Sequence, residues 1–446
     1  MESNNQKMSI VRLVGLTSKS FVQAAYRSNP ALQFLDAIEQ QKYFFANDSV
    51  FNDYFDLRMR ELGIECQSVV HDVQNIRDAW TRTSDFELSG NSNLDLLRAV
   101  IRRFNANVIF EQSAGLLDKH MVLKLKAEFP NLVLVAAHIA SLVNFENYSE
   151  HDVVFVGCES FVMPMKSVGC RKVFFLRHGF DVRLANKYES PERSIDMSFV
   201  GNSGFRNSSY WSRYKYLDRL SGSGLLQNWS IPNQLDSDAR PRMFSFRTML
   251  GASIFNIVKL NIGVLSSLAI RLCGIALVPE DFRNFITKRL GRYSNDYQQL
   301  KQVAFPLNWR FPRIPFYVRD SDRSNPQVFG SEMLRVLGRS KITFHRRADL
   351  VDGCAGAMRL FEATGMGAML LTDEDSDIDL VFEPGIEVVT YSSYEDCVEK
   401  IRYYLEHESE RELIAAKGQE RTMKEHSLDS RYSFIAEQLL KQIQYD

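Results

Sequence analysis

The stretch MRLFEATGMGAMLLTD, at residues 358–373, places a glutamate in an otherwise apolar turn of predicted helix. Glu362 has apolar neighbours on both sides, which disfavours a solvated helix face. The small residues of GCAGA, at 353–357, let the backbone turn tightly into this helix, whose first N–H groups and dipole suit a diphosphate. One turn further on, the carboxylate of Glu362 can accept hydrogen bonds from the two hydroxyls of a ribose. The pattern predicts nucleotide binding, and a structural or capping glutamate is the alternative.

An arginine and two glycines extend this candidate site. Arg359 falls in the first turn of the predicted helix, where a cation opposes the helix dipole unless an anion binds nearby. It is therefore a candidate ligand for the diphosphate, and a simple ion pair with an acidic neighbour is the alternative. Gly365 and Gly367 lie in the turn TGMG after the helix, which we expect to let the chain pass close under the ligand.

Short β-branched segments alternate with helical ones along both halves of the chain. In the first half, strands are predicted at residues 9–16, 66–71, 107–111, 132–137, 152–156 and 172–176. In the second half, strands are predicted at 196–201, 341–345, 368–372 and 387–390, and helices at 330–337, 358–363 and three places between 394 and 444. Continuous apolar strands that alternate with helices indicate parallel sheets covered by helices. The fold class is therefore α/β, with two doubly wound units.

Further candidate residues stand where predicted strands end, because ligands of such folds bind beyond the carboxyl ends of the strands. Gly15 follows the first strand and predicts a turn that a ligand can approach closely. His138 ends the strand LVLVAAH and is a candidate for a place in the cleft, and His345 ends KITFH and is a candidate contact for phosphate or base. A core or surface histidine is the alternative for both. Glu111 is a candidate contact for an acceptor. His178 is a weaker candidate for a functional role, because packing explains its presence equally well.

Composition excludes several other classes of protein. The 446 residues carry a net charge of −1, which gives no reason to expect binding to nucleic acid. The six cysteines show no C-x-x-C spacing, so we expect buried, reduced thiols. The polar opening MESNNQKMSI lacks the apolar core of a signal peptide, and we therefore expect a cytoplasmic protein. The acidic run DEDSDID, at 373–379, is more often a solvated loop than a metal site, so no metal is expected.

One long apolar stretch, at residues 248–278, departs from the pattern of a soluble domain. Four polar residues interrupt it, namely Asn256, Lys259, Asn261 and Arg271. A membrane-spanning helix is therefore not expected. Two interpretations remain: buried or amphipathic helices in a domain insertion at 225–325, or a peripheral membrane contact through residues 248–292, whose basic side chains would meet lipid headgroups.

The C-terminal part of the sequence resembles a known family. MRLFEATGMGAMLLTD and the following LVFEPGIEVVTYSSYEDCVEKIRYYLEHESERELIAAKGQERTMKEHSLDSR are similar to the C-terminal domain of the spore-maturation-protein-like glycosyltransferases. These are relatives of the large retaining "group 1" glycosyltransferases, which have the GT-B fold. QVFGSEMLRVLGRSKITFH (327–345), DMSFVGN (196–202) and RHGFD (177–181) also resemble segments of that group. The resemblance covers most of the chain outside the insertion.

The resemblance implies a GT-B architecture, in which two Rossmann-like domains face each other across a cleft. Residues 1–190 would form the N-terminal acceptor domain. Residues 191–425 would form the donor domain, with a largely helical insertion at 225–325. The C-terminal helix at 426–446 would pack back on the N-terminal domain.

The resemblance also implies roles for individual residues. Glu362 would hold the donor ribose, Arg359 would lie near the diphosphate, and Gly201 would let the phosphates approach. Two positions depart from the family pattern: Cys354 stands where a second glutamate is common, and Ala357 stands where an asparagine is expected. The implied catalytic set is His138, Arg359 and Glu362. The implied nucleotide-binding set is Gly15, Gly201, His345, Arg359, Glu362, Gly365 and Gly367.

The implied activity is transfer of a sugar from a nucleotide sugar to a glycan, lipid-linked or protein acceptor, in bacterial surface polysaccharide or glycoconjugate biosynthesis. We expect retention of anomeric configuration, no metal or other cofactor, and a location in the cytoplasm or at the inner face of the cell membrane. Two other classes stay open. One is a nucleotide-sugar hydrolase or epimerase on the same fold, and the other is a non-catalytic nucleotide-sugar-binding protein.

Overall fold

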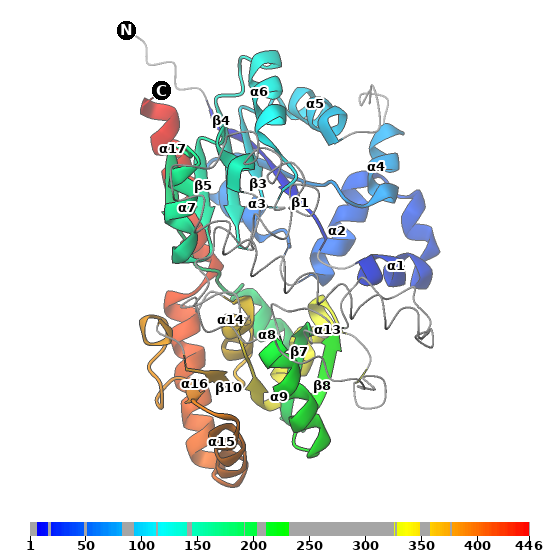
Figure 1. Cartoon of the computed structure of the whole chain (residues 1–446). Coiled ribbons are helices and arrows are strands. Elements are labelled where there is room, and N and C mark those ends of the chain that lie inside the picture. Colours follow the sequence, from blue (N-terminus) through cyan, green and yellow to red (C-terminus); the bar gives the residue numbers. More distant parts are fainter. Residues whose placement is uncertain are drawn as a thin grey trace, which may run out of the picture. The chain divides into compact units, whose positions relative to one another are not determined.

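Two parallel β-sheets, each covered by helices, make up the described part of the chain (Figure 1). The structure is a computed structural model that describes residues 7–16, 19–48, 51–82, 93–112, 115–140, 145–190, 192–202, 211–231, 325, 328–347, 357–374 and 377–445. The chain divides into two compact units, Met1–Ile231 with Pro312–Asp446 and Pro232–Phe311. The second unit lies outside the described residues, and the apolar stretch at 248–278 and most of the expected insertion lie there too.

The first sheet has six parallel strands in the order β2-β1-β3-β4-β5-β6. Their bounds are Ser9–Val14 (β1), Glu65–Val70 (β2), Val108–Glu111 (β3), Leu134–Ile139 (β4), Val153–Val156 (β5) and Lys172–Phe175 (β6). Every residue of β3 and β5 is buried. Strands that are covered on both faces need apolar side chains on both, which explains why these segments read as continuous apolar runs.

Helices cover both faces of the first sheet. The main ones are α1 (Lys19–Ser28), α2 (Ala37–Asn47), α3 (Tyr54–Glu61), α4 (Gln74–Thr81), α5 (Asn93–Phe104), α6 (Lys119–Glu128) and α7 (Val162–Ser167). On one face, Val11 and Leu13 pack against α2, α4 and α5. On the other face, Ile10 and Phe110 pack against α3 and α17 (Leu428–Tyr445). The last helix, red in Figure 1, therefore completes the core of the first sheet.

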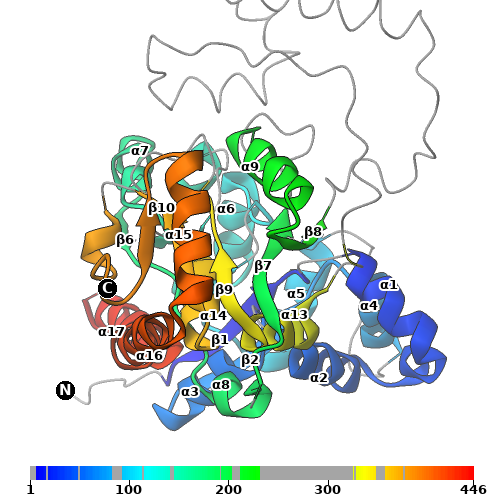
Figure 2. The same ribbon diagram turned by 90° about the horizontal axis from the view of Figure 1, so that it is seen from below.

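The second sheet has five parallel strands in the order β11-β10-β9-β7-β8. Their bounds are Ile195–Asn202 (β7), Gln227–Ile231 (β8), Ser340–Phe344 (β9), Met369–Asp373 (β10) and Val389–Tyr391 (β11). The helices are α8 (Arg183–Tyr188), α9 (Trp211–Gly222), α13 (Gly330–Gly338), α14 (Met358–Gly365), α15 (Tyr394–Glu406) and α16 (Glu408–Glu425). One apolar core packs α8, α13 and α14 on the sheet, and another packs α9 and α15 (Figure 2).

The chain passes between the two sheets in two crossing segments, residues 176–182 and residues 426–427. Phe180 N donates to His426 O at 2.8 Å, and Leu428 N donates to Phe180 O at 2.8 Å. A Cβ atom on Gly179 would lie 2.8 Å from His426 O, so no other residue fits there without a shift of the backbone. The two crossing segments therefore hold each other through their backbones.

The expected α/β fold with two parallel sheets is confirmed, and the predicted strands agree with the observed ones to within about two residues at each end. One expectation is wrong: the insertion was placed from residue 225, yet β8 at Gln227–Ile231 is an edge strand of the second sheet. A second expectation is wrong at one cysteine. Cys66, Cys170 and Cys397 are free and buried, whereas Cys158 is disulfide-bonded. Among the described residues, no helix is long and apolar enough to cross a membrane.

Candidate functional site

Glu362 lies on α14, the helix that follows β9 and begins at the carboxyl edge of the second sheet. The residue is only 5% exposed, because Leu360, Phe361 and Ala363 on both sides of it join the core that α14 shares with the sheet. The N-cap residue of α14 is Ala357, whose side chain makes no capping hydrogen bond. A buried carboxylate needs a partner that offsets its loss of hydration. That partner is Arg359, whose Nη1 lies 2.8 Å from Glu362 Oε2.

Arg359 thus forms the ion pair that was the alternative to phosphate binding. Its Nη1 also lies 2.7 Å from Met333 Sδ of α13. The two interpretations do not exclude each other, since a guanidinium carries five N–H donors and this pair uses only some of its donor capacity. The structure therefore brings together, on one turn of helix, the two side chains that were assigned to ribose and diphosphate.

The positive charges of several arginines act on His345. It directly follows β9, is buried, and its Nδ1 lies 2.9 Å from Thr372 Oγ1 of β10. Loss of hydration lowers the pKa of His345 well below its ordinary value, and the positive charges of nearby arginines lower it further. These arginines are Arg213, Arg346, Arg347 and Arg359. The imidazole is therefore neutral at neutral pH and can accept or donate a hydrogen bond without adding charge.

Two of these arginines tie the ends of neighbouring strands together. Arg213, on α9, donates from Nε to Arg346 O at 2.8 Å and from Nη1 to Asn202 O at 3.2 Å. Arg346 in turn donates from Nε to Ser212 Oγ at 2.9 Å and lies over the ring of Tyr216. The carboxyl ends of β7 and β9 are thereby fixed against the first turn of α9.

The carboxylate of Asp373, the last residue of β10, lies beside Arg347. Asp373 accepts from Arg347 N at 3.1 Å, and its Oδ2 lies 3.4 Å from Arg347 Nε. Burial raises the pKa of Asp373 above its ordinary value, and the charges of Arg346 and Arg347 oppose that rise. Asp377, later in the same acidic run, pairs with Arg177 at 3.5 Å. Among the described residues there is no group of three or more potential metal ligands.

The predicted glycines fall into two groups. Gly201 is the second-last residue of β7, next to Asn202, so it lies at the same edge of the sheet as His345. Gly365 and Gly367 lie at the opposite end of α14. A Cβ atom on Gly365 would lie 2.5 Å from the ring of Phe180, and one on Gly367 would lie 2.6 Å from Arg193 Nη2. The structure thus places these two glycines in packing contacts with the protein and away from Arg359.

The candidates on the first sheet lie at its carboxyl edge. His138, in β4, has its Nε2 3.4 Å from Leu176 O, and its ring centroid lies 5.5 Å from that of His178. Burial lowers the pKa of His138 to about 4, so the ring is neutral at neutral pH. Gly15 follows β1 directly. Glu111 is buried and accepts from Leu116 N at 2.7 Å, which gives it a structural task in its own loop.

The arginines other than Arg359 were missed by the sequence analysis. Arg346 and Arg347 follow the strand KITFH directly, so the same argument that singled out His345 applies to them. Arg213 had no such signal, because its position depends on the return of α9 to the end of β7. Together, the charges of four arginines act on His345, and two carboxylates, Asp373 and Glu362, pair with two of these arginines. Such an excess of guanidinium groups at strand ends suits an anion with several oxygens, such as a diphosphate.

Comparisons with known proteins agree with this architecture. Residues 297–440 match the profile of a family described as Glycosyl transferase-like. No curated protein gives a significant match. A glycosyltransferase from Rickettsia africae superposes with a TM-score of 0.52 at 11% identity, with 99% of this chain and 100% of that chain covered. Sucrose-phosphate synthase from Thermosynechococcus elongatus superposes with a TM-score of 0.53 at 9% identity, with 99% of this chain and 100% of that chain covered.

A third solved structure is an alpha-glucosyltransferase in complex with UDP and a 13-mer DNA. Its TM-score is 0.52 at 10% identity, with 98% of this chain and 100% of that chain covered. At these identities the likeness shows the fold and nothing more. The described chain therefore has the GT-B fold of glycosyltransferases, and the part that carries Arg359 and Glu362 matches a glycosyl transferase-like family.

Proposed function

We propose that the protein is a glycosyltransferase that binds a nucleoside diphosphate sugar at the carboxyl edge of its second sheet. The observation that carries the proposal is the set of arginines at the ends of β7 and β9, where Arg213 binds Arg346 O and Asn202 O, together with the buried pair of Arg359 and Glu362. The arginines suit the diphosphate, and Glu362 is a carboxylate within the same helix turn that can accept hydrogen bonds from a ribose. The match of residues 297–440 to a glycosyl transferase-like family supports this activity.

In the proposed reaction, the bond between the sugar and the diphosphate breaks, the oxygen of an acceptor hydroxyl bonds to the sugar, and the hydroxyl proton passes to the departing diphosphate. The arginines would stabilise the negative charge that develops on the departing diphosphate. None of the described residues is needed as a covalent nucleophile. The resemblance to the spore-maturation-protein-like group further suggests retention of configuration and an acceptor that is a glycan, a lipid-linked glycan or a protein of the bacterial surface.

UDP is the first nucleotide to test, because an alpha-glucosyltransferase of the same fold is described in complex with UDP. Isothermal titration of UDP, ADP and GDP against the wild type should identify one nucleotide that binds. Glu362→Gln keeps the shape of the side chain and removes its charge. We expect this variant to bind that nucleotide at least about 10-fold more weakly, because hydrogen bonds to charged groups are among the strong ones.

Glu383→Gln is the control, since Glu383 is an exposed carboxylate on the loop before β11. It should bind the nucleotide like the wild type. Equal affinity of Glu362→Gln and the wild type would make Glu362 a structural residue. If no nucleotide binds, the proposed activity fails. Incubation of the matching nucleotide sugars without an acceptor separates a transferase from a hydrolase or epimerase, which would convert the donor alone.

A further inference from the structure

A buried carboxylate stands where the chain leaves the first sheet. Asp181, at the end of the crossing segment 176–182, is 2% exposed. It accepts three hydrogen bonds from Arg183, from its backbone N at 3.1 Å, from Nε at 2.9 Å and from Nη2 at 2.7 Å. It accepts a fourth from Asn52 Nδ2 at 2.9 Å. Arg183 lies two residues after Asp181, at the beginning of α8. Asn52 comes from a distant part of the sequence, the loop before α3, and α3 covers the first sheet.

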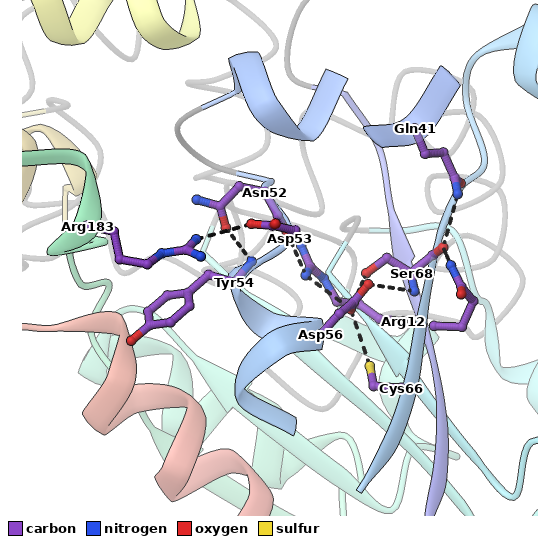
Figure 3. A network of polar contacts seen from close by, with 10 residues as sticks. Arg12, Gln41, Asn52, Asp53, Tyr54, Asp56, Cys66, Ser68 and Arg183 are labelled. Atoms are coloured by element: carbon purple, nitrogen blue, oxygen red, sulfur yellow. Dashed lines mark hydrogen bonds and ion pairs between the residues drawn. The ribbon is translucent and has the colours of Figure 1, made fainter. Parts of the chain in front are cut away.

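Asn52 itself makes three hydrogen bonds, and Figure 3 labels two of its partners, Arg12 and Tyr54. Its carbonyl oxygen accepts from Arg12 Nη1 at 3.1 Å, and its Oδ1 accepts from Tyr54 N at the beginning of α3 at 3.0 Å. Its amide nitrogen donates to Asp181. Asn52 is 3% exposed, so each of these bonds is shielded from water. The asparagine therefore has little freedom to move without breaking several buried bonds.

Arg12 anchors this arrangement inside the first sheet. It lies in the middle of β1, is completely buried, and stands over the ring of Phe55 at 5.0 Å from the ring centroid. Its Nη1 is 3.7 Å from Asp56 Oδ1. Asp56 in turn accepts from Ser68 N at 3.1 Å and from Ser68 Oγ at 2.6 Å (Figure 3). Arg12, on β1, therefore supports the asparagine directly, whereas Ser68, on β2, binds Asp56 at the far end of the network.

The neighbouring contacts reinforce the same junction at the surface. Arg183 pairs with Asp53 at 3.2 Å and lies over the ring of Tyr54 at 4.1 Å from the centroid. Tyr54 Oη donates to Asp429 of α17 at 3.2 Å. The loop before α3 therefore contacts the segment where the chain leaves the first sheet and also the helix on which it returns. These surface pairs are open to solvent and contribute less than the buried bond.

We propose that Asn52 and Asp181 are positioning residues that fasten the crossing segments to the first sheet and thereby control the transfer step without touching the donor. The link to transfer rests on the proposed function, whereas the fastening itself does not. The donor site is built from α9, α14 and the ends of β7, β9 and β10, and neither residue belongs to it. Their loss should therefore loosen the crossing segments and leave nucleotide affinity unchanged.

Hydrogen–deuterium exchange of the full chain tests the fastening without any ligand. The probes are the amides of Phe180 and Leu428, which form the backbone bonds between the crossing segments. In Asn52→Ala and in Asp181→Asn, we expect both amides to exchange at least about 10-fold faster than in the wild type, because local opening becomes easier. The second variant keeps the size of the side chain, so it remains informative if Asn52→Ala folds poorly.

Ser68→Ala is the matched control, because it removes a buried hydrogen bond of the same network at its other end. It should change the exchange of Phe180 and Leu428 by less than about 3-fold. Equal acceleration in Ser68→Ala, or no acceleration in both Asn52→Ala and Asp181→Asn, would overturn the proposal. Titration with UDP forms the second arm: an unchanged dissociation constant in the two variants is expected, and a large loss of affinity would place the residues in donor binding instead.

The two arms separate this proposal from the proposed function. If the wild type binds no nucleotide, the proposed function fails while the exchange experiment still decides whether the crossing segments are fastened. If the wild type binds UDP and the exchange rates stay unchanged, the donor site stands and the fastening is wrong. Where transfer can be followed, Asn52→Ala should lower kcat about 10-fold or more and leave KM for the donor nearly unchanged.

Discussion

Glu362 and Arg359 form one contact that stabilises the fold and that, in the proposed function, would also serve the ligand. Each was assigned to a different part of a nucleotide, and the two side chains neutralise each other at 2.8 Å. A buried carboxylate with no counter-charge would be costly, so the ion pair stabilises α14. A diphosphate bound as proposed would bring negative charge close to Arg359, which would then contact two anions. In the proposed site the pair would therefore couple the ribose and the diphosphate electrostatically.

Arg213 offers a test at the scale of a single side chain. Arg213→Gln removes one of the positive charges that act on His345 and keeps a hydrogen-bonding side chain. We expect the dissociation constant for UDP to rise about 10- to 100-fold, because bonds to charged groups contribute about 1.5–3 kcal/mol each. Uridine, which has no phosphates, should bind with less than about a 3-fold change. Isothermal titration with both ligands measures the difference.

Arg219→Gln is the control for that experiment. Arg219 lies on the same helix as Arg213, is exposed, and faces Glu395 and the ring of Tyr394 instead of the strand ends. Its loss should leave the affinity for UDP unchanged. Equal weakening by the two substitutions would show that α9 as a whole, and not the charge of Arg213, matters for binding.

The sequence was informative about some site residues and silent about others for physical reasons. Glu362, Arg359 and His345 were recognised because a charged or polar residue inside an apolar segment requires an explanation, and the structure brings all three to one edge of the second sheet. Gly365 and Gly367 were misplaced, since a glycine signals a close approach but not what approaches. For Gly365 the neighbour is Phe180, which is far away in the sequence.

At the scale of elements, parallel strands were predictable because they are buried on both faces and carry apolar side chains throughout. Edge strands lack this signal. β8, with the sequence QNWSI, is half polar and was assigned to an insertion, although it pairs with β7 over five residues. The helices α1 and α2 were not predicted either. Their pattern is amphipathic but mixed with polar residues, and only the core of the first sheet decides which face is buried.

The last helix provides a test at this scale. Leu439 of α17 is completely buried against the first sheet, whereas its neighbour Leu440 is 38% exposed. Leu439→Ala should lower the free energy of unfolding by about 2–5 kcal/mol, because it leaves a cavity in a packed core. Leu440→Ala is the same substitution at an exposed position and should change the free energy of unfolding by less than about 0.5 kcal/mol. Urea unfolding of both variants measures the difference, and equal losses would show that α17 does not pack as described.

At the scale of the whole molecule, three histidines near the crossing segments should make stability depend on pH. Burial lowers the pKa of His138 to about 4, of His178 to about 3 and of His426 to about 4. In the unfolded chain these groups take up protons near pH 6.5. Below that pH the unfolded state binds more protons than the folded state, so stability falls as pH falls from about 6.5 towards 4.

His178→Leu tests this explanation. We expect the wild type to lose free energy of unfolding between pH 7 and pH 5, and the variant to lose about 1–2 kcal/mol less, since one fewer group takes up a proton on unfolding. Urea unfolding at the two pH values gives both numbers. His120→Leu, a substitution of an exposed histidine on α6, is the control. An identical pH dependence in wild type and His178→Leu would contradict the assignment.

The position of α17 has a consequence for how this protein is made. The core face that contains Ile10 and Phe110 is covered by side chains from α17, which the ribosome adds more than 300 residues after Phe110. Until α17 has been synthesised, part of the apolar face of the first sheet therefore stays uncovered, although the second sheet is already complete. A fragment cut at the crossing segment would stay in that unfinished condition. The first sheet therefore depends on the last helix of the chain to complete its core.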